Sequence, residues 1–323
     1  MVNKSGRALR KVGVGAAAAT LLVVVGTVAV FTSGRSAGAA SPALGSQSAS
    51  PFDKVGRYVM TDYDRSKPFT SFLPGVNGKY GMPLWSFYVN RGQAITSFGQ
   101  GNKDGPIAQF KSASRAYQET EFTGFRTFIK AKSGRGKPTL YEPFSAVAKH
   151  AVERDMAIGM NEVYIIDKND ALGLQTEVTY FTLPDTDYPG LVRRARFKNT
   201  GKKALDLEVL DGLAQLEPYG VDDWALKMQG RNLEGWMNVY NLDEDAGMPW
   251  FKLSASFKDA AEVNEIIEGN FALAWVEGEE GAGALPQVVD PAIVFGSDTS
   301  LLKADVFDRH ATLAHLLALT QPT

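Results

Sequence analysis

Short runs of β-branched and aromatic residues recur along most of the chain, and Gly, Pro, Asn and Asp separate them. Runs of this kind, bounded by residues that favour turns, are typical of antiparallel strands. Helical periodicity is scarce between them. The sequence therefore predicts a mainly β protein, a large antiparallel β-sandwich, with strands at Trp85–Asn90, Ala94–Phe98, Gly124–Ala131, Asn161–Asp167, Leu174–Leu183, Phe251–Phe257 and Phe271–Val276.

Two more strands are expected from Leu191 to Lys198 and from Ala204 to Leu213. The four residues from Asn199 to Lys202 tolerate positive φ, which predicts a hairpin between the two strands. Apolar and charged residues alternate in both strands, so each has one buried face, and Arg193 interrupts the buried face of the first. The charged rows are expected to pair across the solvent face.

Helices are predicted at only two places, Asp259–Glu268 and Asp308–Leu319. In the second, leucines and alanines form an apolar stripe at helical spacing. We expect one sandwich domain over residues 69–300, followed by the start of a helical linker over residues 301–323.

Composition narrows the range of partners. Of the 323 residues, 44% are hydrophobic and 22% are charged, as in ordinary globular proteins, and the net charge of -2 gives no reason to expect nucleic acid. Neutral polar partners such as sugars fit better. The absence of cysteine excludes a disulfide scaffold and thiolate zinc sites, and the three histidines lack a metal-binding spacing, so no metal is predicted.

The N-terminus has the pattern of an export signal. Four basic residues precede a run from Val12 to Phe31 that carries no charge, and small residues follow at Ser36–Ala40, with cleavage expected after Ala39 or Ala40. The run also has about the ~20 residues that span a bilayer, so a helical anchor is the alternative. We therefore expect residues 1–40 to be a signal peptide or anchor helix, and the protein to be periplasmic or extracellular, or anchored in the inner membrane. The small polar residues from Ser41 to Asp53 predict a linker, which we place at residues 41–68.

Three segments resemble the N-terminal β-sandwich of glycoside hydrolase family 94, the cellobiose phosphorylase type, and most closely its 1,2-β-oligoglucan branch. They are Phe72–Gln93 with its continuation through Ile95–Asp104, Gly124–Lys130 with Tyr141–Phe144, and Arg193–Leu213. The resemblance covers most of the chain from about residue 69 to residue 300.

The resemblance implies an enzyme that splits β-linked gluco-oligosaccharides with inorganic phosphate, inverts the anomeric centre and releases a sugar 1-phosphate. A barrel aspartate protonates the glycosidic oxygen while phosphate, the co-substrate, attacks the opposite face. No other cofactor is implied. Because that aspartate and the phosphate-binding residues lie in a barrel outside this chain, no catalytic residue is predicted here. The implied partners are the oligosaccharide and either the barrel or the second subunit of a homodimer.

The candidate sugar-contacting residues are Trp85, Tyr88, Asn90, Arg91 and Gln93. Aromatic faces with amide and guanidinium donors are the residue types that stack on pyranose rings and bond to their hydroxyl groups. Alternation favours a structural interpretation, in which Trp85, Phe87 and Val89 belong to the core while Ser86, Tyr88 and Asn90 are exposed. Pairs of acidic residues at 222–223, 243–245 and 277–280 fit solvated loops better than a hydrolase site.

Two other functions stay open on sequence alone. One is a free-standing exported carbohydrate-binding sandwich that has no catalysis. The other is a membrane-tethered interaction protein without affinity for sugars, which docks a partner on its apolar C-terminal stripe.

Overall fold

The computed structural model describes the backbone of residues 12–14 and 19–26, and then residues 51–73, 84–146, 152–184, 189–241, 249–258, 261–277, 284–285 and 287–307. This part of the chain is mainly β and forms several antiparallel sheets, as the sequence predicts.

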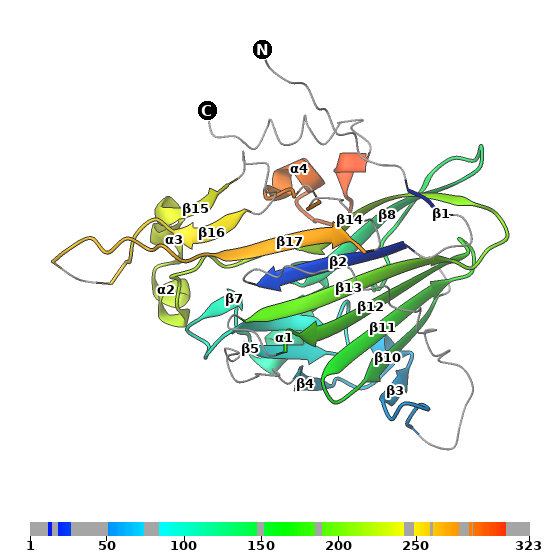
Figure 1. Cartoon of the computed structure of the whole chain (residues 1–323), viewed down its shortest axis with the longest axis horizontal. Helices are drawn as coiled ribbons and strands as arrows, with labels where there is room; N and C mark the ends of the chain where they lie inside the picture. Colours follow the sequence, from blue (N-terminus) through cyan, green and yellow to red (C-terminus); the bar gives the residue numbers. More distant parts are fainter. Residues whose placement is uncertain are drawn as a thin grey trace, which may run out of the picture.

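The largest sheet has nine strands, and all neighbours in it are antiparallel (Figure 1). Its order is β15 (Met237–Tyr240), β16 (Trp250–Leu253), β17 (Asn270–Val276), β2 (Ala19–Gly26), β13 (Gly190–Asn199), β12 (Leu174–Thr182), β11 (Glu162–Asn169), β10 (Glu153–Ile158) and β3 (Tyr58–Thr61).

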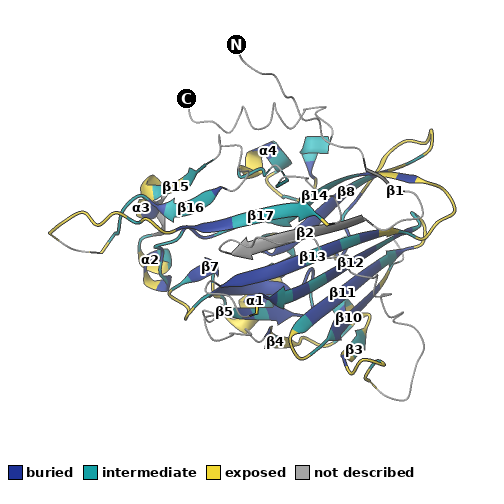
Figure 2. Ribbon diagram, in the orientation of Figure 1, coloured by how far each residue is buried: buried dark blue, intermediate teal, exposed yellow. Residues whose placement is uncertain are grey.

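Two four-stranded sheets complete a sandwich-like arrangement. One has the order β1 (Val12–Val14), β14 (Leu205–Leu213), β8 (Phe125–Ser133) and β9 (Thr139–Tyr141), and the other β4 (Thr70–Leu73), β5 (Leu84–Val89), β6 (Ile95–Gln100) and β7 (Pro106–Ala108). Buried residues of all three sheets belong to one apolar cluster. Figure 2 shows this burial concentrated along β11, β12 and β13.

Within the described residues, helices are few and short. The longest is α1 (Ala113–Thr123), which sequence analysis missed; it contacts β5, β6 and β8. The others are α2 (Asp223–Met228), α3 (Gly230–Leu233), α4 (Pro291–Phe295) and the 3-10 turns η1 (Tyr63–Arg65), η2 (Glu234–Trp236) and η3 (Asp305–Phe307). None of the helices in the described part of the chain has the length and apolarity needed to cross a membrane.

The predicted hairpin between β13 and β14 is wrong, although both strands exist. β13 pairs with β12 and β2, whereas β14 pairs with β8 and β1 in a different sheet. The chain therefore turns from one layer of the sandwich to the other at residues 200–204. The apolar faces of the two strands meet across the core instead of lying side by side, with Leu191, Ala195 and Phe197 in one layer and Leu205 and Leu207 in the other.

The predicted charge pairs between these strands change partners for the same reason. Arg196 lies 3.8 Å from Glu177 on β12, and Arg194 lies 3.8 Å from Glu277. On the other sheet, Glu208 lies 3.6 Å from Lys130 on β8. The Arg196–Glu177 and Glu208–Lys130 pairs join neighbouring strands, whereas the Arg194–Glu277 pair reaches past β2 toward the end of β17.

The apolar N-terminal run contains strands where a helix was expected. Val12–Val14 pair with β14, and Ala19–Gly26 enter the nine-stranded sheet. The helix is wrong for these residues, because Leu21–Val25 includes three β-branched valines that favour strands. An uninterrupted apolar run fits a central strand as well as a helix, and periodicity cannot separate the two.

Two other segments differ from their prediction. Within the expected linker, Tyr58–Thr61 pair with β10 and Tyr63 is fully buried, so the chain is ordered well before residue 69. The expected helix at 259–268 is absent from residues 261–268, where Val263 and Ile267 are highly exposed and have no core to pack against. The predicted C-terminal helix lies outside the described residues.

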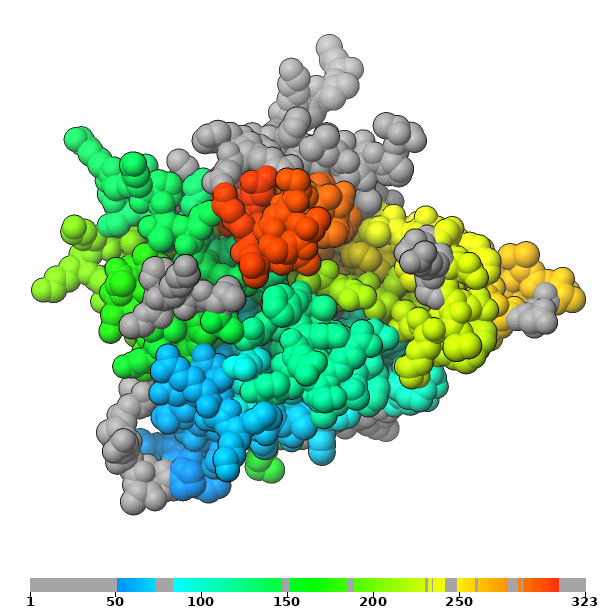
Figure 3. All heavy atoms as spheres, turned by 180° about the vertical axis from the view of Figure 1, so that it is seen from behind, coloured from blue at the N-terminus to red at the C-terminus, as the bar shows by residue number. Residues whose placement is uncertain are grey.

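Segment 287–307 covers the outer surface of the sheet that contains β8 and β14. Phe295 meets Phe128 edge to face at 5.7 Å, and the Lys130 ammonium donates to the Phe307 carbonyl at 3.0 Å. In Figure 3 this segment is the orange and red patch. Leu210 and Ala304 belong to the same apolar cluster, which seals this face.

Candidate functional site

One face of the sheet β4–β7 presents aromatic rings to solvent. Along β5, Leu84, Ser86 and Tyr88 are buried, whereas Trp85 and Phe87 point the other way and are partly exposed. Phe72 of β4 lies directly opposite Phe87, hence on the same side, and 62% of it is exposed. Residues 84–88 of β5 do alternate, but Trp85 and Phe87 lie on the solvent side and not in the core, where the structural interpretation placed them.

Contacts between rings hold this surface together. Phe110 meets Phe87 at 5.6 Å and Trp85 at 5.9 Å, both edge to face, and Trp85 lies 6.1 Å from Phe87. The favoured geometry of each pair gives it stability beyond its buried area. We call Phe72, Trp85, Phe87 and Phe110 the aromatic face.

Trp85 is fixed in orientation at two points. Its indole N–H donates to the Asn102 carbonyl at 2.7 Å. The ring also lies over Gly99 of β6, where a Cβ would stand 2.6 Å from the Cζ2 atom of Trp85. A glycine inside a strand often marks such a close approach. Gly99 thus leaves the space that the indole fills.

Three of the predicted sugar-contacting residues point into the protein instead. Tyr88 is buried in the core, which raises the pKa of its phenol. The Asn90 amide donates to the carbonyls of Tyr63 at 2.9 Å and Lys67 at 3.0 Å, and its oxygen accepts from the Phe69 N–H at 2.7 Å. The hydrogen bonds of Asn90 therefore organise the chain around it.

Gln93 belongs to a second internal network, centred on Arg193. The guanidinium is fully buried and donates to Asp211, Gln93, Thr127 at 3.1 Å and the Tyr180 hydroxyl at 3.2 Å. Burial raises the pKa of Tyr180 to about 12 and also raises the pKa of Asp211 against the pull of Arg193. The network joins all three sheets, which explains a charge on the inner face of β13.

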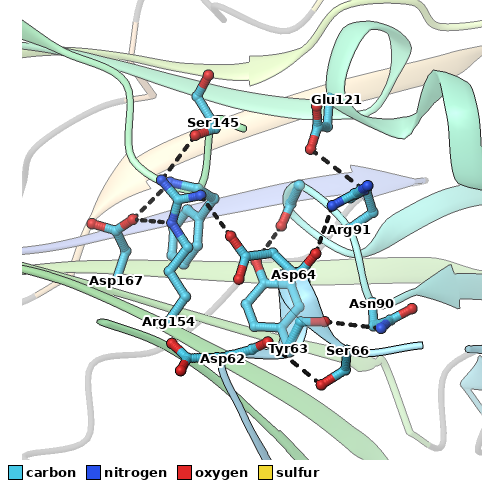
Figure 4. A network of polar contacts seen from close by, with 12 residues as sticks. Asp62, Tyr63, Asp64, Ser66, Asn90, Arg91, Glu121, Ser145, Arg154 and Asp167 are labelled. Carbon is cyan, nitrogen blue, oxygen red and sulfur yellow. Dashed lines mark hydrogen bonds and ion pairs between the residues drawn. The ribbon is translucent and has the colours of Figure 1, made fainter. Parts of the chain in front are cut away.

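Arg91, the fifth candidate, lies at the β5–β6 turn and keeps about a third of its side chain exposed. Its guanidinium donates to the Asp64 carbonyl at 2.6 Å and approaches Glu121 at 3.9 Å (Figure 4). It also lies 5.0 Å above the Tyr117 ring. The structure therefore brings neither Arg91 nor the buried amides onto the aromatic face. Only Trp85 of the five lies there.

The polar cluster around Arg91 continues into the protein through Arg154. This buried guanidinium donates to Asp167 at 2.8 Å, Asp64 at 3.0 Å and the Ser145 carbonyl at 2.9 Å (Figure 4). Asp167 also accepts from the Tyr141 hydroxyl, and burial with this carboxylate raises the pKa of Tyr141 well above its ordinary value.

Two carboxyl groups border this cluster, and burial raises the pKa of both. Glu121 is the first, and Arg91 and Arg154 only partly oppose the rise. Glu142 is the second, although it receives two hydrogen bonds from Arg126, at 2.7 and 3.1 Å. Such groups hold a proton at higher pH than free carboxyls and can donate hydrogen bonds to hydroxyl groups.

The acidic pairs considered in the sequence have structural partners where they are described. Asp222 caps α2 by accepting from the Ala225 N–H at 2.7 Å. Asp223 binds Lys103 at 2.7 Å and Lys227 at 2.6 Å, and these bonds lower its pKa. Residues 243–245 and 279–280 lie outside the described residues.

No metal-binding group was found in the described part of the chain, where no three His, Asp or Glu side chains gather suitably. All three histidines lie outside that part.

No protein-family model matches the sequence, and no curated protein matches it. The sugar contacts predicted for the five residues stay a prediction.

The sequence analysis did not identify Phe72 and Phe110 as part of the aromatic face. Gly99 after the predicted strand Ala94–Phe98 was the one local signal, since it offers space to a neighbouring ring.

Proposed function

We propose that this chain is the non-catalytic sandwich of a β-gluco-oligosaccharide phosphorylase of the family 94 type, and that its aromatic face contacts the oligosaccharide. The resemblance to that family is strongest at Phe72–Gln93, and this segment supplies three of the four rings of the face. In this proposal the sheets are those of the family's large sandwich.

The observation that carries the proposal is the exposure of rings that contact one another on one side of a sheet. Burying an aromatic side chain contributes a large share of core stability, so rings left at the surface together indicate a binding surface. Pyranose rings of β-linked glucans have apolar C–H faces that stack on such rings, while their hydroxyl groups stay in water. The aromatic face offers rings from two adjacent strands, backed by Phe110.

The polar cluster supports the same proposal, because it lies at the end of β5. Arg91, whose side chain is about a third exposed, lies there beyond the aromatic face, and Glu121 beside it has a raised pKa that favours a protonated, donating carboxyl. Bond cleavage itself belongs to the barrel: phosphate attacks and a barrel aspartate protonates the leaving oxygen. This chain positions sugar and breaks no bond.

The same face fits a free-standing exported carbohydrate-binding sandwich, which is our second candidate. The export pattern at residues 1–40 favours this candidate. The sugar 1-phosphate made by a phosphorylase is most useful inside the cell, so an exported phosphorylase would be unusual. Both candidates predict saturable glucan binding, and only the first predicts phosphorolysis once a barrel is joined to the chain.

The test is calorimetric titration of the full chain with β-1,2-, β-1,3- and β-1,4-linked gluco-oligosaccharides. We expect saturable binding of at least one linkage, and about tenfold weaker binding, or ~1.4 kcal/mol, by Trp85→Ala. Trp224→Ala is the matched control, since Trp224 is also exposed but stacks on Phe257 elsewhere in the molecule. Flat titrations, or equal losses in the two variants, would contradict the proposal.

A second assay adds inorganic phosphate to the same mixtures. We expect no sugar 1-phosphate from this chain, because the groups that the resemblance assigns to catalysis lie in the barrel. Formation of sugar 1-phosphate by the purified chain would show that its own residues cleave the bond, and would overturn the non-catalytic role.

A further inference from the structure

Strand β2 lies inside the nine-stranded sheet and is not one of its edges. Residues 19–26 pair antiparallel with Gly190–Phe197 of β13 on one side, and residues 21–25 pair with Ala272–Val276 of β17 on the other. No pairing joins β13 to β17 directly in the described sheet. We call the space between these two strands the β2 slot.

The β2 slot lies at a position where an empty space would leave buried backbone groups without hydrogen bonds. On β13, Leu191, Arg193 and Ala195 are fully buried, and the backbone groups next to them have β2 as their only partner on that side. A buried N–H or C=O that loses its partner costs about 1–3 kcal/mol. An empty β2 slot would also divide the sheet into β15–β17 and the strands from β13 to β3.

The occupant of the slot is also the apolar part of the predicted export signal. Residues 19–26 cannot lie in a membrane and in this sheet at the same time. A leader that a peptidase removes after Ala39 or Ala40 would leave the sheet without its central strand, unless the cut peptide stays bound. This conflict rests on the proposed export of the chain.

We propose that the β2 slot is an acceptor site for one extended apolar strand, that residues 19–26 are its occupant, and that they stay bound after the chain is cut behind them. The recognition is strand addition, in which main-chain hydrogen bonds on both sides supply the affinity. The slot differs from the exposed edge used by most such sites, because both of its walls are strands. Removal of the peptide, and not cleavage itself, would then open the sandwich.

The first test uses the absence of cysteine from the natural chain. In the register, Val23 is the partner of Ala274 on β17. We expect Val23→Cys/Ala274→Cys to form a disulfide in the folded full chain. Val24→Cys/Ala274→Cys is the matched control, because adjacent residues of a strand point to opposite faces. Failure of the first pair, or equal yields from the two pairs, would overturn the proposal.

The second test needs no cysteine. A specific protease site placed after Gly45 lets the folded full chain be cut between β2 and the rest of the protein. We expect the N-terminal piece to co-elute with the sandwich in gel filtration, and a labelled synthetic peptide of residues 17–28 to exchange into the slot.

The control peptide carries Val23→Pro, which lacks the N–H needed in the ladder and is expected to exchange at least tenfold less. Release of the N-terminal piece on cutting, or equal uptake of both peptides, would overturn the proposal. Neither test involves a sugar, so either result leaves the glucan proposal to be judged separately.

Discussion

At the scale of single residues, two of the buried guanidinium groups, those of Arg193 and Arg154, connect elements that lie far apart in the chain. Arg193 joins the three sheets through Asp211, Gln93 and Thr127, and Arg154 joins η1, β10 and β11 through Asp64 and Asp167. A buried charge is tolerated when it is paired and fully hydrogen-bonded, and is strongly destabilising when one partner is lost.

Removing the charge of Asp211, the ion-pair partner of Arg193, should therefore strongly destabilise the folded protein. We expect Asp211→Asn to lower the free energy of unfolding by about 3–5 kcal/mol, measured by urea denaturation, because it leaves the arginine buried beside neutral groups. Glu153→Gln is the control: Glu153 forms an exposed pair with Lys168 at 3.2 Å, worth at most ~1 kcal/mol. Similar losses in both variants would refute the role given to the network.

The pH dependence of stability should depend on Glu121. Burial raises its folded pKa above 4.5, so its contribution to stability is complete below the unfolded pKa and is lost as the pH rises through the folded one. We expect Glu121→Gln to gain stability relative to the natural protein between pH 4 and pH 7, read from urea midpoints at each pH.

Glu119, on the same helix, gives a control of opposite sign. Burial alone would raise its pKa, but hydrogen bonds from Arg115 and Lys111 lower it overall. Its contribution is therefore present above the unfolded pKa and is lost as the pH falls. Glu119→Gln should lose stability relative to the natural protein over the same pH range; trends of equal sign in the two variants would contradict this account.

At the scale of elements, the turn from β13 to β14 decides how the sandwich closes. The Gly173 carbonyl, at the end of the β11–β12 turn, accepts from the Thr200 N–H at 2.8 Å and the Gly201 N–H at 3.2 Å. These bonds hold the chain where it passes from one sheet to the other. Gly173 has a φ of +63°, and a Cβ there would stand 2.9 Å from the Cα of Gly201.

Gly173→Ala should thus be more costly than an ordinary turn substitution. We expect a loss of about 1–3 kcal/mol in unfolding free energy, from backbone strain together with displacement of the β13–β14 turn. Gly134→Ala provides the comparison, because Gly134 has a φ of +53° and nothing within 4 Å of its Cβ position. If Gly134→Ala is equally harmful, the contact with Gly201 contributes nothing.

At the scale of the whole molecule, local patterns predicted eight of the longer strands and missed β3, β4, β7, β9, β10 and β15, and they predicted the pairing of β13 and β14 wrongly. β5, β6, β8, β11, β12, β13, β14 and β17 are found within one or two residues of the expected runs, because β-branched and aromatic residues act locally. The turn residues and the alternation around residues 199–204 fit a hairpin within one sheet and a connection between two sheets equally well. The sequence alone therefore could not tell which of the two forms between β13 and β14. Arg193 stayed unexplained because its partners lie far away along the chain.

The candidate site was predicted in part, for a related reason. Trp85 was found from its residue type, but the face to which it points depends on the register of β5 against β4 and β6. Asn90 and Gln93 have the same residue types as sugar ligands, and only the folded chain shows that their amides bond internally.

The central claim is that sugar binds at the aromatic face, and fluorine NMR of the chain labelled with 5-fluorotryptophan tests it most directly. The five tryptophans give five signals, which single Trp→Phe variants assign. On titration with a β-linked gluco-oligosaccharide, we predict a saturable shift of the Trp85 signal while the Trp224 signal stays in place. A still Trp85 signal, or a shift confined to another tryptophan, would contradict the account.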